Sequence, residues 1–344
     1  MDTWHKIITG NAQNLKEIPD NTVNLVVTSP PYPMVEMWDK LFSNLNPKIK
    51  KELDNNNGLQ AYELMHQELD KVWNEIDRVL NPTGGIICIN IGDATRKIRD
   101  TFQIYQNHAR IIQTFQKLGY ETLPSIIWRK KANKPNKFMG SGMLPVNAYV
   151  TLEHEYILIF RKGGNRKFQT KNERENRKQS AYFIEERNKW FTDTWEDIKG
   201  RKQNLGEKGL RERNGAYPLE IPYRLINMYS VKGDTVLDPF LGTGTTSIAA
   251  LTLQRNSIGY EIDPKFKPHI IKNILNSKEK ANKTITERLK NHKDKLTSKK
   301  HYNHYLKCNV HTKQETNIQF NKINKIKLNK NNNITVKYNE INTR

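Results

Sequence analysis

Cysteine is nearly absent from this chain of 344 residues, which contains only Cys88 and Cys308. Two cysteines so far apart provide neither a disulfide framework nor a CxxC metal site, so we expect a reducing, cytoplasmic setting and no bound metal. Cys88 lies inside the apolar run IICINI, where no neighbouring residue would lower the pKa of its thiol. We interpret it as a small core residue rather than a nucleophile.

A long uncharged apolar stretch is also missing, and MDTWHKIITG at the start lacks the pattern of a signal peptide. Neither a membrane span nor secretion is therefore indicated. Acidic residues are the minority charge, because 36 Asp and Glu face 57 Lys and Arg, for a formal net charge of +21. This excess predicts nucleic acid as a partner, although a coding bias toward Asn, Lys and Ile would contribute to the same count.

Seven apolar, strand-like runs recur along the chain, and helical patterns separate several of them. They occupy residues 4–9, 23–27, 85–91, 124–128, 156–160, 235–239 and 257–262. Strands that alternate with helices predict an α/β domain with a mainly parallel sheet. The clearest helix spans about residues 62–80, where apolar residues repeat with helical spacing until Asn81 and Pro82 end the pattern.

The stretch TSPPY at residues 28–32 directly follows the apolar run VNLVV. Open parallel sheets bind ligands at the carboxyl ends of their strands, so this turn is a candidate site. Pro30 and Pro31 make the turn rigid, and Tyr32 offers a flat aromatic face. Ser29 Oγ and the carbonyl of Pro30 could accept hydrogen bonds from an amino group.

A second candidate site lies at residues 234–263, which read as a strand, a glycine-containing turn, a helix and another strand. Gly242 and Gly244 allow a tight turn close to a ligand, and Glu261 could accept hydrogen bonds from a ribose diol. Asp238 ends the first strand, where its negative charge suits a cationic ammonium group better than a phosphate. These features predict a nucleoside-cofactor site. The spacing differs from GxGxxG, which weighs against a nicotinamide-dependent oxidoreductase.

These motifs together resemble those of the amino-methylating DNA methyltransferases that use S-adenosylmethionine. DPFLGTGTT at 238–246 is similar to the family's cofactor motif, and TSPPY is similar to its catalytic [DNS]PP[YF] motif. TGNA at 9–12 is similar to a further cofactor element of the family. The catalytic motif precedes the cofactor motif, as in the permuted beta class. The resemblance covers about residues 4–270 and implies a Rossmann-like fold with a mostly parallel seven-stranded sheet.

The same resemblance implies roles for individual residues. The implied catalytic residues are Ser29, Pro30, Pro31 and Tyr32. The implied cofactor-binding residues are Asn11, Thr28, Tyr217, Pro218, Asp238, Pro239, Phe240, Gly242, Gly244, Thr245 and Glu261. S-adenosylmethionine is the implied cofactor, and no metal is implied.

The motif positions divide the chain into four segments. Residues 1–162 carry the catalytic half, 163–213 form a basic insertion, 214–275 carry the cofactor half, and 276–344 form a basic appendage or tail. The insertion occupies the place of a target-recognition region in the resembled class, and its Arg and Lys side chains could contact phosphates and guanines. The basic linker at 130–145 is a second candidate for DNA contact.

The expected reaction is methylation of an exocyclic amino group on a base flipped out of double-stranded DNA. Methylation at cytosine C5 is disfavoured because it requires a nucleophilic cysteine in a suitable loop. In the resembled family, serine at the position of Ser29 is commoner with cytosine N4, so N4 is favoured and adenine N6 is the alternative. Methylation of RNA or protein and a non-catalytic DNA-binding role remain open.

We expect a stand-alone modification enzyme of a prokaryotic restriction–modification system. Its expected partners are double-stranded DNA and a separate restriction endonuclease that acts on the same site, with no membrane. The expected location is the cytoplasm. We find no acid-acid-lysine cluster of a nuclease outside the methyltransferase motifs, so a fused endonuclease is not indicated.

Overall fold

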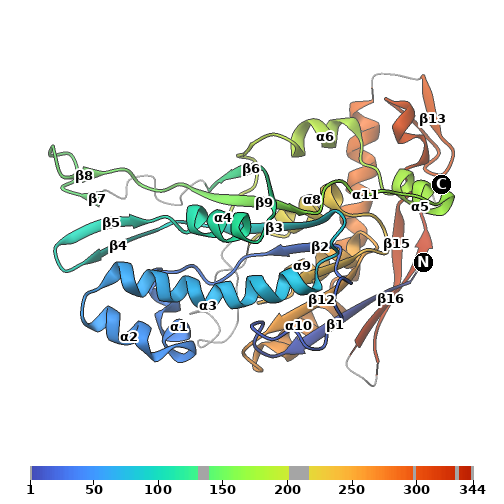
Figure 1. Ribbon diagram of the computed structural model, residues 1–344. Coiled ribbons are helices and arrows are strands. Elements are labelled where there is room, and N and C mark those ends of the chain that lie inside the picture. The colour runs from blue at the N-terminus through green and yellow to red at the C-terminus, as the bar shows by residue number, and fades with distance from the viewer. Residues whose placement is uncertain (1, 131–138, 201–216, 297–299, 330–332, 342–344) are drawn as a thin grey trace.

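The computed structural model describes residues 2–130, 139–200, 217–296, 300–329 and 333–341. A ten-stranded sheet forms its centre, with the strand order β10-β6-β9-β3-β2-β11-β12-β1-β16-β15 (Figure 1). The seven neighbouring strands from β6 to β1 correspond to the seven predicted runs, which confirms the α/β prediction. These strands are β1 Thr3–Thr9, β2 Leu25–Thr28, β3 Gly85–Ile91, β6 Glu121–Arg129, β9 His154–Lys162, β11 Thr235–Asp238 and β12 Asn256–Glu261.

The strands of the sheet's central part run parallel to one another. All pairs from β3 through β2, β11 and β12 to β1 are parallel, whereas β9 is antiparallel to both β3 and β6. The register pairs Asp238 with Gly259 and Thr9 with Glu261. The carboxyl ends of these strands therefore meet at one edge of the sheet, where ligands bind in folds of this kind.

Helices cover both faces of the sheet. On one face, α3 (Gly58–Val79) and α4 (Asn107–Lys117) contribute Trp73 and Phe115 to a core shared with Ile87 of β3. On the other face, α8 (Glu220–Tyr229) and α9 (Thr245–Thr252) pack in a second core that contains Cys88. Successive residues of β3 thus point to opposite faces, as strand geometry requires. The predicted helix at 62–80 is α3, which begins one turn earlier.

Both cysteines are buried and form no disulfide bond. The side chain of Cys88 is fully buried, and this burial raises the pKa of its thiol well above the usual value. Cys308 is also buried and free. The interpretation of Cys88 as a core residue is therefore confirmed.

The remaining elements complete the periphery. The helices are α1 Asp39–Leu45, α2 Pro47–Asp54, α5 Lys171–Gln179, α6 Ile184–Trp190, α10 Phe266–Leu275 and α11 Lys278–Lys295, with short 3-10 turns at Glu36–Trp38 and Lys313–Asn317. The strands are β4 Ala94–Ile98, β5 Thr101–Tyr105, β7 Met139–Gly140, β8 Ala148–Tyr149, β10 Thr194–Trp195, β13 His301–Asn303, β14 Cys308–Val310, β15 Asn321–Leu328 and β16 Asn333–Glu340. None of the described helices is long and apolar enough to cross a membrane.

The sheet is larger than the seven strands that the sequence predicts. β16 pairs antiparallel with β1, and β15 pairs antiparallel with β16, so the C-terminal hairpin extends the sheet. Ile334 and Val336 of β16 pack with Ile7 and Ile270 in a shared core. The weak strand alternation of the C-terminal segment therefore belongs to a hairpin that covers the edge of β1, an edge that would otherwise expose unpaired backbone groups.

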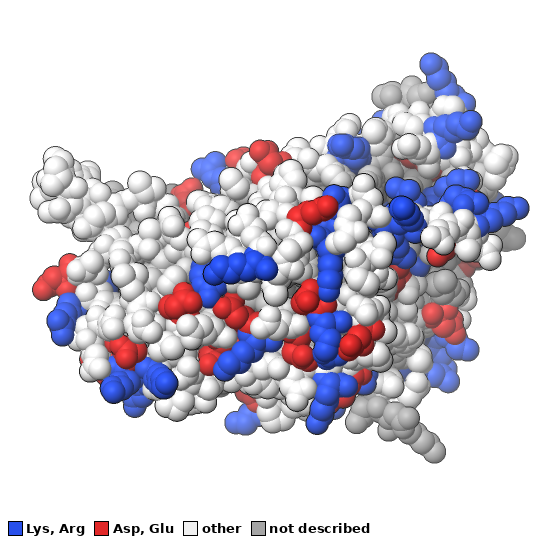
Figure 2. Space-filling view, in the orientation of Figure 1, with Lys and Arg blue, Asp and Glu red and all other residues white. Residues whose placement is uncertain are grey.

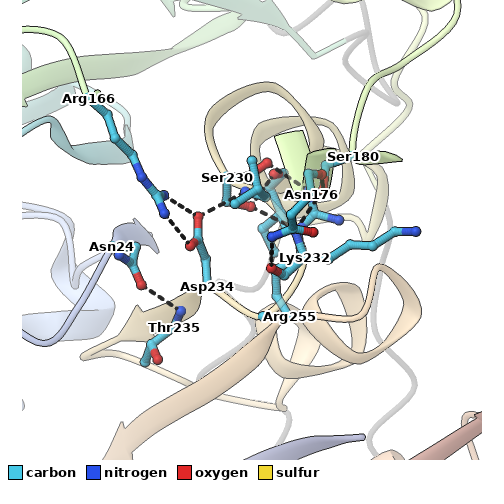
Figure 3. Close-up of polar contacts among 12 residues, drawn as sticks. Asn24, Arg166, Asn176, Ser180, Ser230, Lys232, Asp234, Thr235 and Arg255 are labelled. Atoms are coloured by element: carbon cyan, nitrogen blue, oxygen red, sulfur yellow. Dashed lines mark hydrogen bonds and ion pairs between the residues drawn. The ribbon is translucent and has the colours of Figure 1, made fainter. Parts of the chain in front are cut away.

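An ion pair joins the basic insertion to the amino end of β11. Arg166 donates from Nη1 and Nη2 to the two carboxylate oxygens of Asp234, at 2.7 and 3.0 Å (Figure 3). Beside it, the Lys232 amide donates to Ser180 Oγ at 2.9 Å, and Asn176 Nδ2 donates to the Lys232 carbonyl at 2.8 Å. Helix α5 is thereby held at the edge of the sheet opposite to the carboxyl ends of its strands.

A buried histidine connects α6 to α11. His292 Nδ1 donates to Glu185 Oε1 at 2.7 Å, and Nε2 donates to the Asn309 carbonyl at 3.1 Å. Burial lowers the pKa of His292, but hydrogen bonds with Cys308, Glu185 and Asn309 outweigh it and raise the pKa to about 10. His292 is therefore an imidazolium at neutral pH, paired with a carboxylate whose own pKa is lowered.

The same pair belongs to a group of three side chains with metal-ligating atoms. The ligand atoms of Glu185, His292 and His311 lie within 4.8 Å of one another. A metal would have to displace a proton from His292, both of whose nitrogens already donate to protein acceptors. We therefore interpret Glu185 and His292 as an ion pair that connects the insertion to the C-terminal appendage.

Glu185→Gln should destabilise the protein in a pH-dependent manner. At pH 6 we expect a loss of about 3 kcal/mol, because one partner of a buried pair is removed. The pKa of His292 is raised on folding, so the contribution of the pair is complete below about pH 6.5 and disappears as the pH rises through 10. Chemical unfolding of both proteins between pH 6 and 10 measures the difference, which should shrink with rising pH.

The exposed Glu287 of α11, which lies 3.7 Å from Lys283, provides the control for this measurement. Glu287→Gln should change the free energy of unfolding by less than about 0.5 kcal/mol at every pH. A loss in Glu185→Gln that stays constant up to pH 10 would contradict the raised pKa of His292.

Candidate active site at the carboxyl edge of the sheet

A cavity of about 570 Å³ opens at the carboxyl ends of β2, β11, β12 and β1. It brings the two motifs of the sequence together, although more than two hundred residues separate them. From the first motif, Ser29, Pro30, Pro31 and Tyr32 line it. From the remaining predicted set, its walls include Asn11, Tyr217, Pro218, Asp238, Pro239, Phe240, Gly242, Thr245 and Glu261. Thr28 and Gly244 are the two residues of the predicted set that do not line the cavity.

Asp238 forms a buried, negatively charged part of the cavity wall. Its Oδ1 accepts hydrogen bonds from Thr28 Oγ1 at 2.7 Å and from the Phe240 amide at 3.1 Å. Its Oδ2 accepts from Thr246 Oγ1 at 2.5 Å and from the Tyr217 hydroxyl at 3.4 Å. All four donors are neutral, and burial raises the pKa of Asp238. A cationic ligand in the cavity would balance the negative charge of Asp238, which the neutral donors leave uncompensated.

Glu261 is fixed in the cavity wall by backbone donors. Its Oε2 accepts from the Gly242 amide and its Oε1 from the Asp263 amide, both at 3.0 Å. Gly242 and Gly244 have φ values of 55° and 87°, a region that favours glycine. A Cβ on Gly244 would lie 3.0 Å from Ile270, so this glycine shapes the loop at the start of α9. The carboxylate is thereby oriented for hydrogen bonds from a diol.

Tyr32 is the centre of a hydrogen-bond network on the other side of the cavity. Its hydroxyl lies 3.1 Å from Ser29 Oγ, 3.0 Å from Glu155 Oε2 and 2.8 Å from Asn90 Nδ2. Lys130 Nζ forms an ion pair with Glu155 Oε1. Burial raises the pKa of Tyr32 well above its usual value, so the phenol remains protonated.

Three further side chains, Asn90, Glu155 and Lys130, line the cavity. Lys130 begins the basic linker 130–145 that the sequence indicates as a candidate for DNA contact, whereas no motif identifies Asn90 or Glu155 as site residues. Glu155 belongs to the run HEYILIFRK, which the sequence indicates only as a strand. An acidic residue at the start of an otherwise apolar strand could have indicated a site residue, because buried charges occur where they are paired or functional. Asn90 lies inside the apolar run of β3, where it is the one amide-bearing side chain.

The structure separates the parts of the basic insertion. Helix α5 lies at the amino edge of the sheet, whereas Gly200 lines the cavity at the carboxyl edge. Residues 201–213 of the insertion and 131–138 of the basic linker lie outside the described residues. The hairpins β4–β5 and β7–β8 project beyond the carboxyl edge (Figure 1), and Phe102 stacks on Tyr149 between them with ring centroids 4.5 Å apart.

A family model described as DNA methylase matches residues 23–273 of the chain. The chain is 55% identical to the type II methyltransferase M.MthZI of Methanothermobacter thermautotrophicus, over 99% of this chain and 97% of that one. It is 56% identical to the type II methyltransferase M.MjaI of Methanocaldococcus jannaschii, over 79% of this chain and 91% of that one.

Two solved structures share the fold. The protein TTHA0409 of Thermus thermophilus, solved in complex with S-adenosyl-L-methionine, is 32% identical with a TM-score of 0.61, over 78% of this chain and 93% of that one. The cytosine-N4-specific PvuII DNA methyltransferase is 18% identical with a TM-score of 0.53, over 84% and 93% of the two chains. The second likeness concerns the fold alone, and together they confirm the Rossmann-like prediction.

Two buried acids at opposite ends of β11 should respond differently to neutralisation. Asp234→Asn removes the partner of Arg166 and should cost about 2 kcal/mol of stability. Asp238→Asn should cost less at pH 7, because the raised pKa of Asp238 means that its ionised form opposes folding above pH 3.8, which offsets part of the loss of accepted hydrogen bonds. Urea unfolding of both variants without ligand measures this, and equal losses would contradict the proposed charge imbalance at Asp238.

Proposed function

The chain belongs to the DNA methylase family of amino-methyltransferases, and we propose that it methylates the N4 atom of cytosine in double-stranded DNA with S-adenosylmethionine. The observation that carries this proposal is that one cavity contains both the TSPPY turn and the carboxylates of Asp238 and Glu261. One side of this cavity suits a cationic nucleoside, and the other suits a planar amino substrate.

The cofactor side fits S-adenosylmethionine by charge and by donor set. Asp238, with neutral hydrogen-bond donors around it, would attract the ammonium group of the methionine part. Glu261, oriented by two backbone amides, would accept hydrogen bonds from the ribose hydroxyls. S-adenosylmethionine supplies an electrophilic methyl group on a sulfonium. Thr28 and Gly244 would support this site by holding Asp238 and shaping the glycine loop.

The substrate side would activate the target amino group. Conjugation of the nitrogen lone pair with the ring makes an exocyclic amine a weak nucleophile. Hydrogen bonds accepted by Ser29 Oγ and the Pro30 carbonyl would favour a pyramidal nitrogen whose lone pair can attack the methyl carbon. The N–C bond would form as the S–C bond breaks, S-adenosylhomocysteine would leave, and the extra proton on the nitrogen would pass to water. Tyr32 would stack on the flipped base, and the two prolines keep the acceptors in place before the reaction.

Cytosine is the favoured base because of Ser29 and of the donor beside it. Serine at this motif position is commoner with cytosine N4 in the family. Lys130 also lines the cavity next to Glu155, where it could donate to the O2 or N3 acceptors of a cytosine edge. Adenine offers only N1 beside its amino group. Adenine N6 is therefore the second outcome of the test below.

DNA would bind across the carboxyl edge of the sheet. The β7–β8 hairpin projects from this edge (Figure 1). The turn between its two strands exposes Met143, Leu144 and Val146. Apolar side chains of this kind can enter a duplex as wedges during base extrusion. In Figure 2 many Lys and Arg gather over α5 and β13, on the far side from this hairpin. We therefore assign target recognition to the part of the 163–213 insertion near Gly200, which lines the cavity, and to the hairpins rather than to α5.

Membership of this family supports a proposal about the cellular partner. Type II methyltransferases such as the relatives above act on DNA within restriction–modification systems. We propose that a separate restriction endonuclease shares the recognition site of this protein, which protects the host DNA from cleavage.

The reaction is tested by mass spectrometry of nucleosides from unmethylated DNA incubated with the protein and S-adenosylmethionine. N4-methylcytosine is the expected product. N6-methyladenine would retain the mechanism and overturn the base assignment. Absence of any methylated deoxynucleoside, with methylation of RNA under the same conditions, would overturn the DNA substrate.

Two substitutions should separate chemistry from cofactor binding. Ser29→Ala should lower the rate of methyl transfer by about 100-fold and leave the dissociation constant of S-adenosylmethionine unchanged, because an oriented acceptor of the transition state is lost. Glu261→Ala should weaken cofactor binding by about 10-fold, as expected for the loss of a charge-assisted hydrogen bond. Isothermal titration and single-turnover methylation measure the two quantities, and an exchange of the two phenotypes would refute the assignment.

A further inference from the structure

Glu155 can only accept hydrogen bonds in its ionised form. Its Oε2 accepts from Tyr32 Oη at 3.0 Å and from Asn90 Nδ2 at 2.7 Å. Its Oε1 accepts from Lys130 Nζ, which also lies over the ring of Trp128, 4.6 Å from the centroid. Lys130 and Glu155 thus form an ion pair at the wall of the cavity. The Tyr32 hydroxyl must therefore be the donor in its contact with Glu155.

The orientation of Asn90 follows from the same acceptor. Its Nδ2 lies 2.7 Å from Glu155 Oε2 and 2.8 Å from Tyr32 Oη. A reversed amide would place Oδ1 against a carboxylate oxygen, which is repulsive, so the amide nitrogen faces these two atoms. Asn90 thus donates one hydrogen toward the phenolic oxygen and one toward the carboxylate.

These donors determine the direction of the hydrogen bond between Tyr32 and Ser29. Tyr32 Oη gives its hydrogen to Glu155 and accepts one from Asn90, and Ser29 Oγ lies 3.1 Å from it. With the phenolic hydrogen already committed, the contact between the two hydroxyls requires Ser29 to donate. The hydrogen of Ser29 then points toward Tyr32 and away from the substrate.

We propose that Glu155 is a positioning residue that acts through Tyr32 to turn the Ser29 hydroxyl hydrogen away from the target base. Ser29 Oγ then offers both of its lone pairs to the target amino group. A freely rotating hydroxyl could instead donate to the amino nitrogen and occupy the lone pair that must attack. This inference deepens the proposed function and rests on it, because it concerns the same amino substrate.

We call the hydrogen-bonded series Glu155–Tyr32–Ser29 the relay, and the surrounding packing holds it in one geometry. Gly92 follows β3, and a Cβ at this position would lie 3.0 Å from Tyr32 Cε2 and 3.2 Å from Glu155 Cγ. The backbone therefore lies directly against both side chains, and a larger residue at position 92 would displace them. Burial also raises the pKa of Tyr32, so the phenol keeps the hydrogen that it donates.

Glu155→Gln and Tyr32→Phe test the relay from its two ends. A glutamine must present its amide group either to Lys130 or to Tyr32 and Asn90, so it cannot reproduce the all-acceptor carboxylate. Phenylalanine keeps the stacking face of residue 32 and removes only the hydroxyl. Glu153→Gln is the matched control, because Glu153 precedes the same strand and pairs with Arg129 at the surface, 3.3 Å away.

The measured quantities are the single-turnover rate of methyl transfer from labelled S-adenosylmethionine to unmethylated DNA and the dissociation constant of S-adenosylmethionine. We expect Glu155→Gln and Tyr32→Phe each to slow transfer by about 10- to 100-fold, with cofactor affinity within about twofold of wild type. The double variant should be no slower than the slower single variant, because both changes interrupt one relay. Glu153→Gln should react at the wild-type rate.

The outcomes distinguish this inference from the proposed function. A wild-type protein that methylates no DNA would overturn the proposed function itself. A wild-type protein that methylates DNA, with Glu155→Gln or Tyr32→Phe at full rate, would overturn only the relay. A double variant slowed by the product of the two single effects would show independent roles and would also overturn it. If Glu155→Gln does not fold, the rate of Tyr32→Phe decides the question.

Discussion

The hydrogen bond from Thr28 to Asp238 joins the last residues of two adjacent parallel strands, and both halves of the site depend on it. Thr28 is followed directly by the turn that carries Ser29, and Asp238 is followed by the glycine loop. Because β2 and β11 pair in parallel register, the two loops leave the sheet side by side at one edge. A hydrogen bond of 2.7 Å between buried groups then fixes the distance between the TSPPY turn and the glycine loop.

The sequence predicts this edge of the sheet well because the relevant signals are local. Seven apolar runs, a double proline and a glycine turn each determine their own backbone conformation, so the strands and the two loops follow from short stretches. The polar network around Tyr32 is different, because Asn90 and Glu155 come from β3 and β9, whose pairing is a long-range contact. Their side chains meet only after the sheet forms, and nothing in either strand alone indicates the partner.

The outer strands and the basic segments were harder to predict for a related reason. β15 and β16 alternate apolar and polar residues only weakly, since one face of the hairpin packs on the core with Ile323 and Val336 and the other is exposed. The position of α5 depends on Arg166, which pairs with Asp234 across a long sequence separation. A run of positive charge predicts an anionic partner in general, but it does not distinguish such a partner from a buried carboxylate of the same chain.

Two buried carboxylates on one cavity have opposite electrostatic arrangements, and the difference fits the two ligands of the proposed reaction. Asp238 accepts hydrogen bonds from neutral donors, so its charge remains uncompensated until a cation arrives. Glu155 has Lys130 as an ion-pair partner, so its charge is balanced before any ligand binds. A neutral base placed beside an uncompensated carboxylate would lose hydration without gaining a counter-charge. In the proposed reaction, the compensated acid would instead lie beside the base and orient hydroxyl hydrogens, while the uncompensated one would add to the affinity for the cationic cofactor.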